Sequence, residues 1–135
     1  MQQHINFITL GVADLAASRR FYREVFGWQE TADSNENIAF FQAGGALLFA
    51  LFGRDALAHD AELPAAHSSG FPRFTLAHNV GSEAEVDVLF AELAAKQVTI
   101  FKPPQKVFWG GYSGYIADLD GFLWEIAYNP FLEKL

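Results

Sequence analysis

The sequence contains no cysteine, so disulfide bonds, thiolate metal sites and thiol nucleophiles are excluded. It also lacks an uninterrupted apolar run of the roughly 18 residues that a membrane-spanning helix needs. The first residues, MQQHINF, have neither the charged nor the apolar segment of a signal peptide. We therefore expect a cytoplasmic protein with no membrane partner, in which any metal site would have to use His, Asp or Glu.

Basic residues are scarce as well. Nine Lys and Arg stand against sixteen Asp and Glu, which gives a formal net charge of −7, and no Lys/Arg cluster interrupts this balance. Such a surface repels a phosphate backbone, so nucleic acid is not an expected partner. Aromatic residues, in contrast, are abundant, since they make up 16 % of the chain and include 14 Phe. We expect some of these rings to line a pocket.

Two segments of the chain repeat the same order of structural signals. Residues 7–28 read as an apolar strand, Asp14 in the N-cap position, and a helix with apolar residues at helical spacing. Residues 74–98 read as a strand, a capping box of Ser82 and Glu85, and a second amphipathic helix. Three strand-like pieces follow each helix, so both halves have the order β-α-β-β-β. They lie at residues 28–33, 37–43 and 46–52 in the first half and at 98–101, 114–118 and 122–128 in the second.

These halves predict one α+β domain over residues 1–135, with module 1 at about 1–52, a linker at 53–70 and module 2 at about 71–130. The linker, GRDALAHDAELPAAHSSG, is polar and Ala-rich, which suits a connection or a mobile flap. Its histidines, His59 and His67, are expected to face solvent unless the flap closes over a pocket. The adjacent aromatic pairs at 21–22 and 40–41 are expected in the core, because neighbouring rings usually serve two packed layers.

Three segments carry a family resemblance: ITLGVADLAASRRFY near the start, DLDGFLWEIAYNP near the end, and FWGGYSGY between them. Together with the paired halves, they resemble the vicinal oxygen chelate superfamily of glyoxalases, bleomycin resistance proteins and extradiol dioxygenases, and FWGGYSGY is similar to a glyoxalase-like subset. The resemblance implies a cup-shaped mixed sheet built by two βαβββ modules, with the helices on its outer face. In metal-dependent members, the first and last strands of each module supply ligands to a divalent cation that acts as a Lewis acid.

The resemblance aligns four positions of this chain with those ligands: Phe7, Phe49, Thr75 and Glu125. Phe49 is aligned through the glycine turn before its strand, with Gly45 set against Gly121. A phenylalanine ring has no lone pair for a cation and Thr75 is a weak neutral donor, so only Glu125 matches the family carboxylate. A single carboxylate holds a divalent cation loosely. We therefore expect a metal-free cup and no cofactor. A divalent metal enters only under the alternative that a histidine, misplaced in register or supplied by a dimer mate, completes the site.

Strand parity, by which alternate residues point to the same face of a sheet, extends this set. Thr9 shares its face with Phe7, and Arg73 shares its face with Thr75. Trp109 follows Pro103-Pro104 in a loop, where its ring lids the cup, covers a dimer partner or anchors a satellite core. Only one of Tyr112 and Tyr115 can reach the cavity. No residue is predicted to be a metal ligand, the catalytic residues remain open, and the predicted ligand-binding residues are Phe7, Thr9, Phe49, Arg73, Thr75, Trp109, Tyr115 and Glu125.

Three roles are open for Glu125. Arg73 is a candidate partner, because a carboxylate in an aromatic cavity needs a compensating cation, and such an ion pair would be structural. The second role is contact with a ligand. The third is that of a general base, for which the sequence offers no evident electrophilic partner.

The leading interpretation is a metal-independent protein that binds a small, partly apolar or aromatic molecule in the cup, as sequestering or resistance proteins do. The second is a divalent-metal-dependent lyase, isomerase or dioxygenase that uses Glu125. The third is a non-catalytic dimeric structural or regulatory module whose aromatic residues form the interface. An open curved sheet leaves exposed edges, so we expect a homodimer under each of them.

Overall fold

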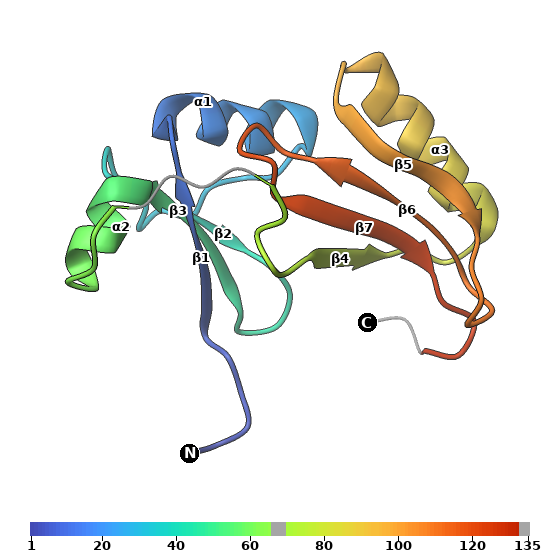
Figure 1. Cartoon of the computed structure of the whole chain (residues 1–135), viewed down its shortest axis with the longest axis horizontal. Coiled ribbons are helices and arrows are strands. Elements are labelled where there is room, and N and C mark those ends of the chain that lie inside the picture. Colours follow the sequence, from blue (N-terminus) through green and yellow to red (C-terminus); the bar gives the residue numbers. More distant parts are fainter. Residues whose placement is uncertain (66–69, 133–135) are drawn as a thin grey trace. The chain divides into compact units, whose positions relative to one another are not determined.

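The computed structural model describes residues 1–65 and 70–132 (Figure 1). His67 lies outside these residues. The chain divides into two compact units, Met1–Ser68 and Ser69–Leu135, and each has its own sheet and helices. The α+β fold class is therefore confirmed. Among the described residues, no helix is long and apolar enough to cross a membrane.

Unit 1 is built on a three-stranded sheet of order β1-β3-β2. The strands are β1 (Phe7–Val12), β2 (Ile38–Gln42) and β3 (Leu48–Gly53). Strand β1 runs parallel to β3, whereas β2 runs antiparallel to it. The additional strand predicted at residues 28–33 is reduced to one bridge between Glu30 and Phe41. The Glu30 carboxylate instead pairs with Arg19 and Arg23, which ties this segment to the helix before it.

A helix covers one face of this sheet. The predicted cap is present, because Asp14 Oδ1 accepts a hydrogen bond of 3.0 Å from the backbone N–H of Ala17. Helix α1 (Leu15–Arg20) continues into a π-helical segment, η1 (Phe21–Val25). Tyr22 from this segment is fully buried, and its ring centroid lies 5.0 Å from those of both Phe26 and Phe49. The core of unit 1 is an aromatic cluster made of Phe21, Tyr22, Phe26, Trp28, Phe41 and Phe49.

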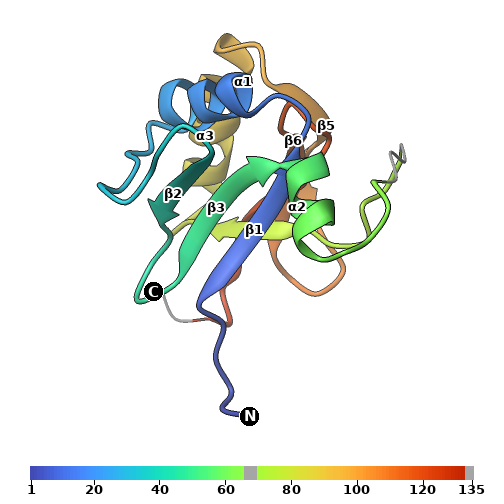
Figure 2. The same ribbon diagram turned by 90° about the vertical axis from the view of Figure 1, so that its left-hand side faces the viewer.

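A second helix occupies part of the predicted linker. Helix α2 (Arg54–Asp60) follows β3 directly and packs on β1 and β3, as Figure 2 shows. The segment predicted as a linker thus contains a helix, and ALA at 56–58 consists of strong helix formers. The contact depends on Gly11 in β1, where an added Cβ would lie 3.0 Å from the Cα of Arg54.

Unit 2 is built on a four-stranded sheet of order β4-β7-β6-β5. Its strands are β4 (Leu76–Asn79), β5 (Thr99–Lys106), β6 (Tyr112–Ala117) and β7 (Leu123–Tyr128). Strand β4 is parallel to β7, and the other pairs are antiparallel. Strand β5 continues through Pro103 and Pro104, which lie within a region where its register with β6 shifts. Proline is compatible with this position because β5 is an edge strand.

Helix α3 (Glu83–Ala95) covers one face of the unit 2 sheet. The backbone N–H of Glu85 donates to Ser82 Oγ at 3.1 Å, and that hydroxyl lies 3.5 Å from the Glu85 carboxylate, so the predicted capping pair is present. Phe90 reaches β6 at Gly114, where an added Cβ would lie 2.7 Å from its ring. Trp124 and Ile126 of β7 are buried. Alternate residues of the same strands, including Glu125, form the opposite face, which we call the open face of unit 2.

Candidate functional site

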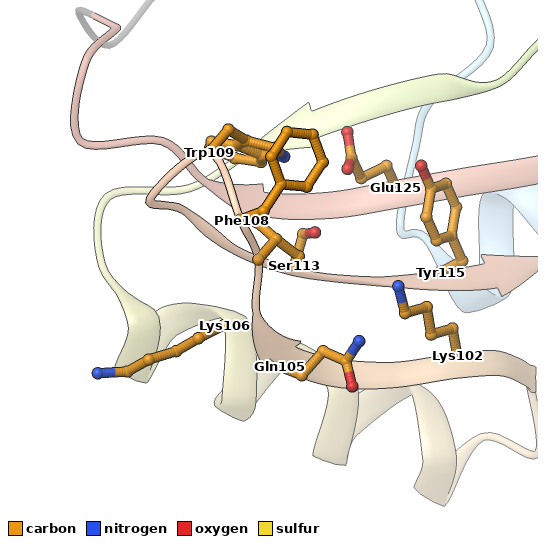
Figure 3. A pocket seen from close by; sticks show the side chains of 9 residues that line it. Lys102, Gln105, Lys106, Phe108, Trp109, Ser113, Tyr115 and Glu125 are labelled. Atoms are coloured by element: carbon orange, nitrogen blue, oxygen red, sulfur yellow. The ribbon is translucent and has the colours of Figure 1, made fainter.

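A cavity of about 330 Å³ lies on the open face of unit 2 (Figure 3). Strands β5, β6 and β7 and the loop between β5 and β6 form its walls. Every residue that lines it belongs to unit 2. The lining residues are Lys102, Gln105, Lys106, Val107, Phe108, Trp109, Ser113, Tyr115 and Glu125.

The sheet register aligns three polar side chains across this pocket. Tyr115 on β6 lies directly opposite Glu125 on β7 and Lys102 on β5. Residues that lie opposite each other on neighbouring strands point to the same face. The outer two Cα atoms are two strand spacings apart, or roughly 10 Å. We call Lys102, Tyr115 and Glu125 the polar row.

Tyr115 and Glu125 are joined within the polar row. Burial raises the pKa of Tyr115 above its ordinary value, and the negative charge of Glu125 and a hydrogen bond to its carboxylate raise it further. The phenol therefore stays protonated at neutral pH and donates to Glu125, and Figure 3 shows the two groups pointing toward one another. This contact fixes the direction of the carboxylate.

Lys102 forms the other end of the polar row. It is half-buried, and its ammonium group extends toward the pocket in Figure 3. Within the part of the chain that the structure describes, no ion pair joins Lys102 to a carboxylate. The pocket therefore presents a cation at one end and a hydrogen-bonded anion at the other.

The loop between β5 and β6 supplies the aromatic wall. The backbone N–H of Val107 donates to the Gly111 carbonyl at 3.0 Å, and that of Gly110 donates to the Val107 carbonyl at 3.0 Å. The Trp109 ring lies directly against Gly111, where an added Cβ would come within 1.9 Å of it. Gly110 has a φ of 96°, a conformation that favours glycine. The two glycines thus set the position of Trp109 at the pocket.

The side chains beside Glu125 do not suit a divalent cation. Its neighbour on β4 is Ala77, whose methyl group has no donor atom. Its neighbour on β6 is the protonated phenol of Tyr115, and the ammonium group of Lys102 in the same pocket repels a cation. Across residues 1–65 and 70–132, no three His, Asp or Glu side chains gather into a metal-binding group. The pocket lining offers one carboxylate, Glu125, where such an ion requires several ligands.

Trp109, Tyr115 and Glu125 are the predicted site residues that line this pocket. Arg73 and Thr75 are exposed and precede β4. The predicted Arg73–Glu125 pair is wrong, because no ion pair links these two residues among those described. Arg73 adopts a φ of 69°, so the chain is still turning there and the strand begins only at Leu76.

The predicted direction of Phe49 is also wrong. Phe49 lies opposite Phe41 in the sheet and is only 2 % exposed. Its ring packs in the aromatic core against Phe41 and against Tyr22 of η1. Phe7 lies opposite Leu48, so Phe7 and Thr9 point to the other face, where Phe7 is 51 % exposed. Alignment through a glycine turn misplaced β3 by one residue, and a slip of one residue reverses the face of a strand. None of these predicted residues lines the unit 2 pocket.

Sequence reasoning misses Lys102 and Ser113. A strand predicted over residues 98–101 ends before Lys102, whereas β5 continues to Lys106. The signal that identifies Lys102 is the edge position of β5, where prolines can remain within a strand. Ser113, which is 3 % exposed, follows from β6 parity, because it shares the Tyr115 face. Tyr112 points the other way, and its hydroxyl donates to Asp87 of α3 at 2.6 Å.

The chain is similar to known proteins over nearly all of its length. A glyoxalase-related enzyme from Fulvimarina pelagi is 40 % identical, with a TM-score of 0.83 over 96 % of this chain and 90 % of that chain. A lactoylglutathione lyase from Agrobacterium tumefaciens is 25 % identical, with a TM-score of 0.72 over 95 % of each chain. A glyoxalase/bleomycin resistance protein/dioxygenase from Nocardioides is 22 % identical, with a TM-score of 0.81 over 99 % of this chain and 91 % of that chain.

No curated protein matches the chain. Residues 4–126 match the sequence model of the Glyoxalase/Bleomycin resistance protein/Dioxygenase superfamily. That match covers both repeated halves and includes Glu125 at the end of the second. The chain therefore belongs to the glyoxalase/bleomycin resistance protein/dioxygenase superfamily.

Proposed function

We propose that the protein binds a small, partly aromatic molecule in the unit 2 pocket through its own side chains, without a divalent cation. The observation that carries this proposal is the polar row beside an aromatic wall. A cavity of about 330 Å³ is at the lower end of the range of roughly 300–1,000 Å³ that is typical of small-molecule sites. Such sites combine apolar walls with a few placed polar groups.

Glu125 acts in this proposal as a binding anchor. Tyr115 donates to it and holds its carboxylate in one orientation before the ligand arrives. A preorganised group loses less conformational freedom on binding, which favours affinity. The Trp109 ring, fixed against Gly111, adds a rigid apolar surface at the same cavity.

A second candidate is a reaction at the same pocket with a divalent cation held by Glu125. The 40 % identical relative supports it, because that protein is described as a glyoxalase-related enzyme. The local chemistry favours the first proposal, since Ala77 beside Glu125 has no donor atom and Lys102 adds a positive charge to the same pocket. The two proposals differ in one measurable property, which is the metal dependence of binding.

Metal dependence can be tested with aromatic carboxylates and amines of one ring, such as 4-methylbenzoate and 4-methylbenzylamine. Each probe is titrated into protein held in EDTA, and tryptophan fluorescence is followed. We expect saturable binding that a subsequent addition of excess Mn²⁺ leaves unchanged. We also expect Mn²⁺ to cause no selective paramagnetic broadening of the NMR signals of Tyr115 and Glu125. Binding that requires Mn²⁺, together with broadening that disappears in Glu125→Gln, would establish the metal-dependent alternative.

A further inference from the structure

The two ends of the polar row carry opposite charges, and this difference defines the ligand more narrowly. We propose that the ligand is a small zwitterion with an aromatic body, whose anionic group binds Lys102 and whose ammonium group binds Glu125. This inference rests on the proposed function, because it assigns a charge pattern to the ligand of the same pocket.

The cationic end of the pocket selects an anion. Lys102 belongs to β5 and points into the cavity, and no carboxylate within the described residues neutralises it. A half-buried ammonium group gains more from an anionic partner than a fully hydrated one does, because the effective dielectric constant is lower. Lys106, on the same strand, also lines the cavity, but its ammonium end extends away from Glu125 and Tyr115 in Figure 3. Lys102 is therefore the residue that recognises the anionic group.

The anionic end of the pocket, Glu125, selects a hydrogen-bond donor. A carboxylate accepts hydrogen bonds at about four lone-pair sites. Tyr115 occupies one of these on Glu125 and lies between Glu125 and Lys102 in the sheet. The free acceptor capacity at the cavity suits an ammonium group, which forms a charge-assisted hydrogen bond with a carboxylate.

The separation of the strands that carry the two charges favours an extended ligand over a compact one. Lys102 and Glu125 lie on strands separated by β6, so their Cα atoms are roughly 10 Å apart. They do not form an ion pair with each other, and the Tyr115 ring lies between their strands. We therefore assign the ligand two charges at opposite ends of a body about the size of one ring. The Trp109 ring supplies an apolar surface for that body.

A set of matched probes tests this charge pattern. The zwitterion is 4-(aminomethyl)benzoate, whose ammonium and carboxylate groups lie at opposite ends of one benzene ring. The controls are 4-methylbenzoate, 4-methylbenzylamine and phenylalanine, which carry the anion alone, the cation alone and both charges at one end. Affinities are measured by NMR titration of the wild-type protein in EDTA. We expect the zwitterion to bind roughly 10- to 100-fold more tightly than either singly charged probe, as a charge-assisted hydrogen bond implies.

Three variants assign each charge to a residue. Lys102→Met should remove the advantage of the zwitterion over 4-methylbenzylamine, and Glu125→Gln should remove its advantage over 4-methylbenzoate. Lys96→Met is the matched control, because it removes the same charge from unit 2 at an exposed position outside the pocket lining, and it should leave the affinity within about two-fold. If a variant fails to fold, the comparison of probes on the wild-type protein decides by itself.

Two results would overturn the inference, and they are distinguishable. If all four probes bind the pocket with similar affinity, the charge pattern is wrong while the proposed binding function stands. If phenylalanine binds more tightly than 4-(aminomethyl)benzoate, the separation of charges is wrong. Failure of every probe to shift the signals of Tyr115 and Trp109 would instead contradict the proposed function itself.

Discussion

Replacement of Gly111 by alanine should displace Trp109 from the pocket without unfolding the protein. The added Cβ would lie 1.9 Å from Cζ3 and 2.0 Å from Cη2 of the Trp109 ring. Carbon atoms in contact prefer about 3.5 Å, so the ring must withdraw by about 1.6 Å or more. Gly111 is not among the residues with positive φ, so alanine fits the backbone itself. The added methyl group therefore displaces the Trp109 ring and leaves the backbone conformation unchanged.

The displaced ring should weaken ligand binding by a modest factor. An aromatic contact contributes about 0.5–1.5 kcal/mol, which corresponds to a loss of roughly 2- to 12-fold in affinity. NMR titration with 4-(aminomethyl)benzoate measures this loss. The indole Nε1–H signals of the three tryptophans report the displacement directly, and the Trp109 signal should shift much more than those of Trp28 and Trp124.

Gly53→Ala is the matched control. At Gly53 an added Cβ would meet the Cβ of Ala56 at an ordinary distance of 3.9 Å. This variant should leave the Trp109 signal and the affinity unchanged. The reasoning fails if Gly111→Ala keeps both the wild-type Trp109 signal and the wild-type affinity, because Trp109 would then not form the wall of the pocket.

Four further predictions concern packing and titration. Phe49→Ala should lower the free energy of unfolding, measured by urea denaturation, by about 3–5 kcal/mol, because it leaves a cavity in the aromatic core, and a loss below about 1 kcal/mol would contradict that placement. Gly114→Ala should cost about 1–3 kcal/mol in the same assay, since the new Cβ would lie 2.7 Å from the Phe90 ring, and unchanged stability would show that this contact is not tight. Glu125→Gln should lower the pKa of Tyr115, followed by NMR, but leave it above the ordinary value because burial is the largest cause of the shift. Since the folded pKa of Tyr115 is raised, its stabilising contribution is present below the unfolded value of 10.0 and is lost as the pH rises through the folded value. The free energy of unfolding that the substitution Tyr115→Phe removes should therefore be smaller at alkaline pH than at neutral pH. An equal loss at both pH values would refute this assignment.

The fold and one end of the site could be predicted from local signals. The turn at residues 118–121 fixes the start of β7, because Asp118 Oδ1 accepts hydrogen bonds of 2.9 Å from the backbone N–H groups of Asp120 and Phe122. With that start fixed, strand parity places Glu125 on the open face and Trp124 beneath α3. The caps at Asp14 and Ser82 are equally local, because each involves residues three apart.

The rest of the site depends on long-range pairing, which local patterns do not contain. The face of Phe49 follows from its pairing with Phe41 and not from the glycine turn before β3. The position of Lys102 beside Tyr115 follows from a shifted register in β5. A single residue of slip reverses a side chain, so the partners of a predicted site residue need the observed register.

The most direct test of the central claim is an NMR map of bound 4-(aminomethyl)benzoate on isotope-labelled protein in EDTA. We expect saturable shifts of the NMR signals of Tyr115, Glu125 and Trp109. Intermolecular NMR contacts should place the ammonium end of the ligand near Glu125 and its carboxylate end near Lys102. Shifts at these residues that develop only when a divalent cation is supplied, or shifts confined to other parts of the chain, would contradict it.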